Sequence, residues 1–139
     1  MLSLLSIAIS VAALSAAVVD FEPSDAAPPM VRIAELEIDP AQLRAYEAIL
    51  AEEQEASVRL EPGVLMLHSV TLKDEPNHVR LLEVYANRAA YEAHLKAPHF
   101  IKYKTSTEYM VKSLRLLEAK PILLCAKATH KHGEPISCS

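Results

Sequence analysis

Two ionisable side chains interrupt a long apolar stretch of the sequence, His68 and Glu83. An imidazole can take up and release a proton near neutral pH, and a carboxylate beside it can orient the ring. If the two segments that carry them form a tight hairpin in which Leu72 pairs with Val79, His68 stands directly opposite Glu83. We therefore predict a proton-handling pair, and the alternative is a cross-strand ion pair without a chemical role.

The same hairpin register brings further side chains to this pair. Met66 pairs with Tyr85, so a thioether and a phenol flank the imidazole and the carboxylate. A phenol hydroxyl can hold a substrate oxygen, and apolar walls exclude water from it. We take Met66 and Tyr85 as candidate substrate-binding residues.

A second group of candidates surrounds Pro98. It comprises His94 and His99, with the aromatic residues Tyr91 and Phe100 beside them. Either histidine can serve as a base, or can cap a helix or bond to solvent instead. We take the two histidines as candidate catalytic residues and the two aromatic rings as candidate substrate-binding residues.

Metal ligation is not indicated by the residue spacing. The two cysteines, Cys125 and Cys138, show no zinc-site pattern, and His130 and His132 form an isolated His-x-His that is typical of a solvated tail. In an exported protein the two cysteines could form a disulfide, and otherwise they are free thiols. We expect neither a metal nor a cofactor.

Hydrophobic periodicity predicts the elements that must position these side chains. The predicted order is strand 31–38, a helix from 40 to about 60, strands 64–72 and 79–85, a helix after Asn87 that Pro98 interrupts, further helical turns over 99–113, and strand 114–120. This βαββαβ order predicts a ferredoxin-like α+β sandwich, with one antiparallel sheet and helices on one of its faces. Along the first helix an apolar stripe recurs at three- and four-residue steps, and the glutamates are mostly assigned to the solvent side: Glu47, Glu52, Glu53 and Glu55.

The predicted sheet is apolar on both faces. In its second strand we expect Met66 and Val70 on one face and Leu65 and Leu67 on the other. The helices can cover only one face, so the other must be buried by something else, most simply a second copy of the chain. We expect a homodimer whose sheets face each other.

The N-terminal segment, residues 1–19, carries no charged side chain. It is predicted to be a signal peptide or a retained membrane anchor, and a folded N-terminal helix is the third alternative. Residues 20–30 are predicted to be a linker, 31–120 the domain, and 121–139 a C-terminal tail. We expect an exported protein, periplasmic or secreted.

The composition bounds the class of protein. A chain of 139 residues has room for one domain, and a net charge of −4 disfavours nucleic-acid binding. The sequence has no glycine-rich dinucleotide loop, no phosphate-binding Walker loop, no Gly-x-Ser-x-Gly nucleophile motif and no His-Glu-x-x-His zinc motif. The familiar nucleotide-dependent, serine-hydrolase and zinc-protease chemistries are therefore not indicated.

Three features together resemble the antibiotic biosynthesis monooxygenase family, nearest to its quinol monooxygenase branch. They are the Glu-Pro-Gly turn in LEPGVLML at 60–67, the strand end Glu83-Val84-Tyr85 in LLEVYANRAAYEAHL at 81–95, and the His-Leu-x-x-Pro-His-Phe element that runs from His94 through LKAPHF at 95–100. The resemblance covers about residues 31–120. It implies the ferredoxin-like fold of the dimeric α/β-barrel superfamily, sheet-to-sheet dimers, and a pocket between sheet and helices.

The resemblance also implies an activity. Members oxygenate or oxidise electron-rich phenols and quinols with O₂, typically without metal, flavin or haem. Haem degradation is not expected, because the chain has no tryptophan and carries Lys104 where haem-degrading relatives use an axial histidine. In such an enzyme, one of the three candidate histidines would be the base, Glu83 would orient it and Tyr85 would hold the substrate oxygen. The alternatives are a dimeric module that binds a small aromatic molecule without turnover, and a purely structural dimer.

Overall fold

The structure is a computed structural model that describes residues 27–127 and 136–138. The predicted leader, 1–19, lies outside the described residues, so its interpretation as signal peptide or anchor stays a prediction. Within the described residues, no helix has the length and apolar character needed to cross a membrane.

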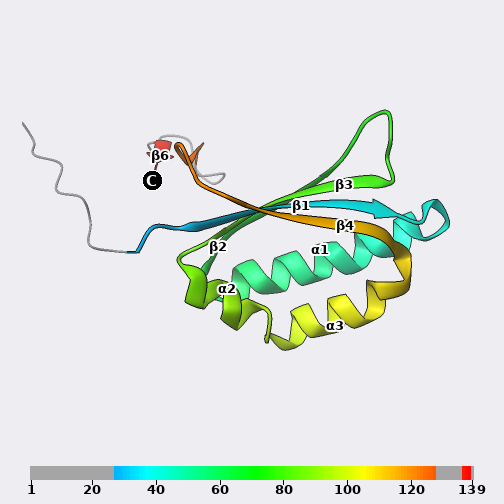
Figure 1. Cartoon of the computed structure of the whole chain (residues 1–139). Coiled ribbons are helices and arrows are strands. Elements are labelled where there is room, and N and C mark those ends of the chain that lie inside the picture. The colour runs from blue at the N-terminus through cyan, green and yellow to red at the C-terminus, as the bar shows by residue number, and fades with distance from the viewer. Residues whose placement is uncertain (1–26, 128–135, 139) are drawn as a thin grey trace, which may run out of the picture.

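The elements follow the predicted order. They are β1 (Met30–Ile38), the 3₁₀ turn η1 (Pro40–Gln42), α1 (Leu43–Leu60), β2 (Val64–Thr71), β3 (His78–Tyr85), α2 (Arg88–His94), α3 (Pro98–Thr107), the 3₁₀ turn η2 (Glu108–Met110), β4 (Val111–Ala119), β5 (Cys125–Lys127) and β6 (Ile136–Cys138). The first four strands form an antiparallel sheet in the order β2-β3-β1-β4, and α1 and α3 lie against one of its faces (Figure 1). The predicted ferredoxin-like α+β fold is confirmed. The helical turns predicted up to residue 113 end earlier, because β4 already begins at Val111.

Local sequence signals set the helix starts. Asp39 accepts a hydrogen bond from the backbone of Ala41 at 3.0 Å, and Pro40 follows it in the first turn. Asn87 accepts from the backbone of Ala90 at 2.9 Å and so caps α2. Pro98 starts α3, because proline is tolerated only in the first turn of a helix.

One glycine lets α2 approach the start of β2. A Cβ placed on Gly63 would lie 2.5 Å from Cβ of Ala90, far inside van der Waals contact. Gly63 also accepts a backbone hydrogen bond from Ala86 at 2.9 Å. The absent side chain therefore fixes the position of α2, the helix that carries two of the candidate site residues.

The core fills the space between the sheet and the helices. Its main cluster consists of side chains from β1, α1, β3 and η2: Ala34, Leu36, Ile38, Tyr46, Leu50, Val79, Leu81 and Met110. A smaller cluster of Met30, Val64 and Tyr85 lies near α2. Between these two clusters the layer is not filled, and a cavity opens there.

The predicted pairing of His68 with Glu83 is wrong by one residue. In the observed register His68 pairs with Leu82, and Leu67 pairs with Glu83. Met66 correspondingly pairs with Val84 rather than with Tyr85. Because side chains alternate between faces, this shift places His68 on the face away from the helices, where it is exposed.

An irregularity in β2 changes which residues share a face. The register shifts between Val64 and Met66, so Leu65 is an extra residue in the strand. Val64 and Leu67 therefore both face the helices, whereas Met66 faces away from them. As expected, Leu67 lies on one face of the sheet, and Met66 and Val70 lie on the other face.

The outer face of the sheet combines an apolar part with a charged part. Val70 is 60% exposed and Leu82 is 37% exposed. In a single chain the helices cover only the inner face, so apolar side chains on the outer face are exposed. Further along the same face, Arg80 and Arg115 pair with Glu35 at 3.8 and 3.4 Å. The partner sheet expected from the sequence stays a prediction.

The tail contains a two-stranded ladder beyond β4. Cys125 is disulfide-bonded, and the other cysteine of the chain, Cys138, lies directly opposite it in the β5–β6 register. Of the two alternatives for the cysteines, the structure favours the disulfide.

Candidate active site

A cavity of about 440 Å³ lies between the sheet and the helices. Its walls come from every layer of the fold, and its ionisable and aromatic lining residues are Arg32, Glu53, Glu83, Tyr85, Tyr91, His94, Phe100, Tyr103, Lys104, Glu108 and Lys112. Leucines and other apolar side chains make up most of the remaining wall. A volume of this size suits a small aromatic molecule.

His94 is the buried imidazole of this cavity, with only 3% of the residue exposed. Its Nδ1 lies 2.9 Å from Oε1 of Glu61, and the ring of Phe100 packs against it at 4.6 Å between centroids. His99 contacts the same carboxylate oxygen from the other side, with Nε2 at 2.5 Å. One carboxylate therefore bridges the two histidines.

The charge state of Glu61 fixes the tautomer of His94. Burial acts to raise the pKa of Glu61, but hydrogen bonds from His94 and His99 outweigh it and hold that pKa below its ordinary value. An ionised carboxylate only accepts, so Nδ1 of His94 must carry a proton and donate it to Glu61. When the ring carries only this one proton, Nε2 presents a lone pair on its other side.

Glu53 stands on that other side of the ring. Its Oε1 lies 3.8 Å from Nε2 of His94 and accepts a hydrogen bond of 2.6 Å from Ser57. Burial raises the pKa of Glu53, in spite of the hydrogen bond from Ser57. The second nitrogen of His94 therefore faces a carboxyl group that tends to keep its proton.

A second carboxyl group enters the cavity from the sheet. The hydroxyl of Tyr85 donates to Oε2 of Glu83 at 2.9 Å, and both side chains come from the inner face of β3. Burial raises the pKa of Glu83. Burial also raises the pKa of Tyr85, and the neighbouring Glu83 carboxylate raises it further. Tyr85 is therefore a neutral phenol over the whole physiological range.

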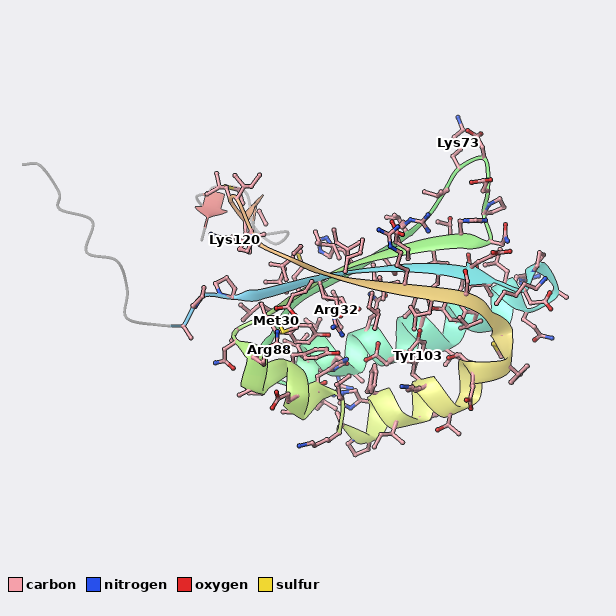
Figure 2. All side chains as sticks on the ribbon, viewed as in Figure 1. Met30, Arg32, Lys73, Arg88, Tyr103 and Lys120 are labelled. Carbon is pink, nitrogen blue, oxygen red and sulfur yellow. The ribbon has the colours of Figure 1, made fainter. Side chains whose placement is uncertain are left out.

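Arg32 projects from β1 towards the helices, as its labelled side chain shows (Figure 2). Its Nη1 donates to the hydroxyl of Tyr91, and its guanidinium carbon lies 4.4 Å from the centre of that ring. The Tyr91 ring meets Tyr85 edge-on at 5.3 Å. The cation of Arg32 and two aromatic rings thus gather at the α2 end of the cavity.

The family model for antibiotic biosynthesis monooxygenase matches residues 29–106, more than half of the chain and most of the described domain. This chain belongs to the antibiotic biosynthesis monooxygenase family. A solved structure from Bacteroides thetaiotaomicron that carries the same family name is 52% identical, has a TM-score of 0.68, and is matched over 68% of this chain and 90% of that one.

Other solved structures share the fold. A Lactobacillus acidophilus protein named as a monooxygenase is 34% identical with a TM-score of 0.63, over 63% of this chain and 42% of that one. A Mycobacterium tuberculosis protein is 22% identical with a TM-score of 0.62, over 68% of this chain and 92% of that one, which shows the fold alone. No match was found among curated proteins.

The structure of this monooxygenase-family chain brings some predicted site residues together and separates others. Five of them line the cavity: Glu83, Tyr85, Tyr91, His94 and Phe100. His99 does not line the cavity, but it is connected through Glu61 to His94, which does. His68 and Met66 lie on the outer face of the sheet and do not line the cavity.

Sequence reasoning missed three residues of the site. Glu53 was assigned to the solvent side of the first helix, yet it is buried. The signal was present, because the buried residues of α1 are Tyr46, Leu50, Glu53 and Ser57, which recur at steps of four, three and four. The sequence predicts Glu61 only as part of the Glu-Pro-Gly turn, and no local pattern marks Arg32. Both residues act through contacts that are distant in the chain.

The histidine cluster also has the composition of a metal site. Glu53, His94 and His99 each offer one ligand atom, and these atoms lie within 4.8 Å of one another. Two imidazoles and a carboxylate suit a first-row transition metal. Nε2 of His94 faces Glu53 and is not bonded to Glu61, whereas Nε2 of His99 is held by the Glu61 carboxylate.

Proposed function

We propose that this protein uses its cavity to oxidise or oxygenate a small phenol or quinol with O₂, without a cofactor. The observation that carries the proposal is the placement of His94: a buried imidazole whose Nδ1 lies 2.9 Å from Glu61 and whose Nε2 is not bonded to that carboxylate, beside a largely apolar cavity. A dihydroxyarene becomes a reductant for O₂ once it is deprotonated. The protein then needs a base, an anchor and a dry site.

The proposed reaction starts with proton transfer to His94. A substrate hydroxyl gives its proton to Nε2, and the positive ring that results is stabilised by the Glu61 carboxylate at 2.9 Å. In the simplest case a quinol loses two electrons and two protons and becomes a quinone. O₂ takes up these two electrons and two protons and becomes hydrogen peroxide. In an oxygenation, one oxygen atom of O₂ enters the ring as a hydroxyl and the other leaves as water, so that the quinol and O₂ give a hydroxylated quinone and water.

His99 offers a route by which the proton leaves. Its Nε2 shares Oε1 of Glu61 with His94, and its side chain is 17% exposed, compared with 4% for His94. Glu61 therefore connects the buried ring to one that reaches solvent. In this proposal His94 is the catalytic base, Glu61 orients its ring, and His99 passes the proton from Glu61 to solvent.

Glu83 and Tyr85 serve as the anchor in this proposal. The Tyr85 hydroxyl donates to Glu83 and keeps its own lone pairs for a substrate hydroxyl. The raised pKa of Glu83 favours a carboxyl group that can donate a hydrogen bond to a developing phenolate. In this proposal Tyr85 accepts a hydrogen bond from the substrate hydroxyl, and Glu83 donates one to the phenolate oxygen as it forms.

The test is O₂ uptake by purified protein with a panel of reduced quinols and polyphenols, in the presence of a chelator. We expect uptake above the buffer rate, a loss of at least about 100-fold in His94→Gln, and no change in the matched control His68→Gln on the outer face. Uptake that survives in His94→Gln would remove His94 as the base. No uptake with any compound, together with binding of the same compounds, would favour the non-catalytic aromatic-binding module instead.

We also propose that the protein acts as an exported homodimer. The exposed apolar side chains of Val70 and Leu82 support burial of the outer face against a second sheet. The disulfide at Cys125 supports an oxidising compartment such as the periplasm or the cell exterior.

A further inference from the structure

Arg32 is held inside the domain without a carboxylate partner. It lies on the inner face of β1, opposite Glu83 in the β1–β3 register, and its long side chain carries the guanidinium away towards α2. Among the described residues, no carboxylate oxygen lies within 4.0 Å of it. Arg32 is half-buried, and a cation partly withdrawn from water is normally paired with an anion, because an unpaired one loses part of its hydration without replacement.

One edge of the guanidinium has no hydrogen-bond partner among the described residues. Nη1 is committed to the hydroxyl of Tyr91, whereas Nε is buried and has no hydrogen-bond partner in the described part of the chain. No bond from Nη2 occurs there either. Nε and Nη2 form the side-on edge of an arginine, which matches the two oxygens of a carboxylate.

No carboxylate of the described residues is in direct contact with this cation, although Glu83 and Glu118 lie opposite it on the two neighbouring strands. Arg32 is the only lysine or arginine of the lining that is not exposed, since Lys104 and Lys112 lie at the exposed rim. The two buried carboxyl groups, Glu53 and Glu83, both have raised pKa values and so tend towards the neutral form. An anionic group that enters beside Tyr91 therefore meets a guanidinium with which no carboxylate of the described residues forms an ion pair.

We propose that Arg32 binds an oxyanion substituent of the ligand, a carboxylate carried on an aromatic ring. The ring then lies against the aromatic side chains of Tyr91 and Phe100, and a hydroxyl further along it reaches His94. The identity of the reaction rests on the proposed function. The anion site itself does not, and it narrows the substrate to hydroxylated aromatic acids.

Two probes test the site without any redox chemistry. Benzoate and benzamide have nearly the same shape, but only benzoate is an anion, and neither reacts with O₂. By titration calorimetry we expect the intact protein to bind benzoate about 10- to 100-fold more tightly than benzamide, which is the range for one charge-assisted hydrogen-bonded pair. Equal affinities for the two probes would overturn the proposal.

Variants assign the preference to the residue. Arg32→Gln should abolish the preference for benzoate, and Arg32→Lys should keep only part of it, because an ammonium cannot bond side-on. The control is Arg115→Gln on the outer face, which removes an arginine whose side chain is 69% exposed and should leave the preference intact. A preference that persists in a folded Arg32→Gln would overturn the proposal. If that variant does not fold, the probe pair and Arg32→Lys still decide.

This test and that of the proposed function can fail separately. If benzoate binds through Arg32 but no hydroxylated aromatic acid causes O₂ uptake, the anion site stands and the oxidation does not. If uptake occurs equally with neutral quinols and their carboxylated forms, the oxidation stands and the role of Arg32 in selecting substrates is refuted.

Discussion

Replacing Gly63 with alanine should destabilise the domain and displace its site together. The new Cβ would lie 2.5 Å from Cβ of Ala90 and 3.4 Å from its Cα. Carbon atoms in contact are about 3.5–4.0 Å apart, so the first distance is too short by roughly 1 Å or more. Both Cβ atoms are bonded directly to the backbone, and no side-chain rotation can relieve the overlap.

The cost follows from what has to move. Overpacking that forces a backbone shift costs about 1–3 kcal/mol, which corresponds to a fall in melting temperature of roughly 4–8 °C for each kcal/mol in a domain of this size. α2 must yield, and that helix carries Tyr91 and His94. Urea denaturation should therefore show a lower midpoint, and the O₂-uptake or benzoate assays should show impairment in the same variant.

A second substitution isolates the cause. Ala90→Gly removes the facing Cβ and by itself costs about 0.5–1 kcal/mol of helix stability. In the double variant Gly63→Ala/Ala90→Gly we expect nearly the stability of Ala90→Gly alone, which is a large coupling in a double-mutant cycle. Simple addition of the two losses would refute the reasoning, because the damage from Gly63→Ala would then have another source.

Two further predictions concern the pH dependence of stability and the outer face of the sheet. Because burial raises the pKa of Glu83, the folded chain keeps this proton to higher pH than the unfolded chain, and the stability contributed by the neutral carboxyl is lost as pH rises above about 4.5 through the folded pKa. In urea titrations, the stability of Glu83→Gln relative to the unmodified protein should therefore increase from acid to neutral pH. The exposed control Glu55→Gln should show no such increase. The same stability difference between Glu83→Gln and the unmodified protein at both pH values would contradict this. Val70→Asp should convert the expected dimer to monomers in sedimentation analysis, while Glu55→Gln leaves it intact; a Val70→Asp protein of unchanged mass would argue against the sheet-to-sheet interface.

Local chemistry was sufficient to predict the elements and their order. The alternation of Ala34, Leu36 and Ile38, the cap at Asp39 and the cap at Asn87 each act over a few residues, and each is found in the structure. The βαββαβ order then left few ways to arrange the chain. The pocket between sheet and helices was implied by the family resemblance and not by these local signals, and the structure places the candidates His94 and Tyr85 in its wall.

Long-range geometry decided the chemistry of the site. The extra residue at Leu65 and a one-residue difference in the hairpin register turned His68 to the outside, since each step along a strand reverses the face. Glu61 meets His99 across 38 residues of sequence, and Arg32 meets Tyr91 across 59. Periodicity states which residues are buried or exposed on one element, but not which side chains on different elements meet. The pattern along the chain therefore determined the scaffold, and only the packing of helices on the sheet determined which histidine is oriented by a carboxylate and which arginine is left without one.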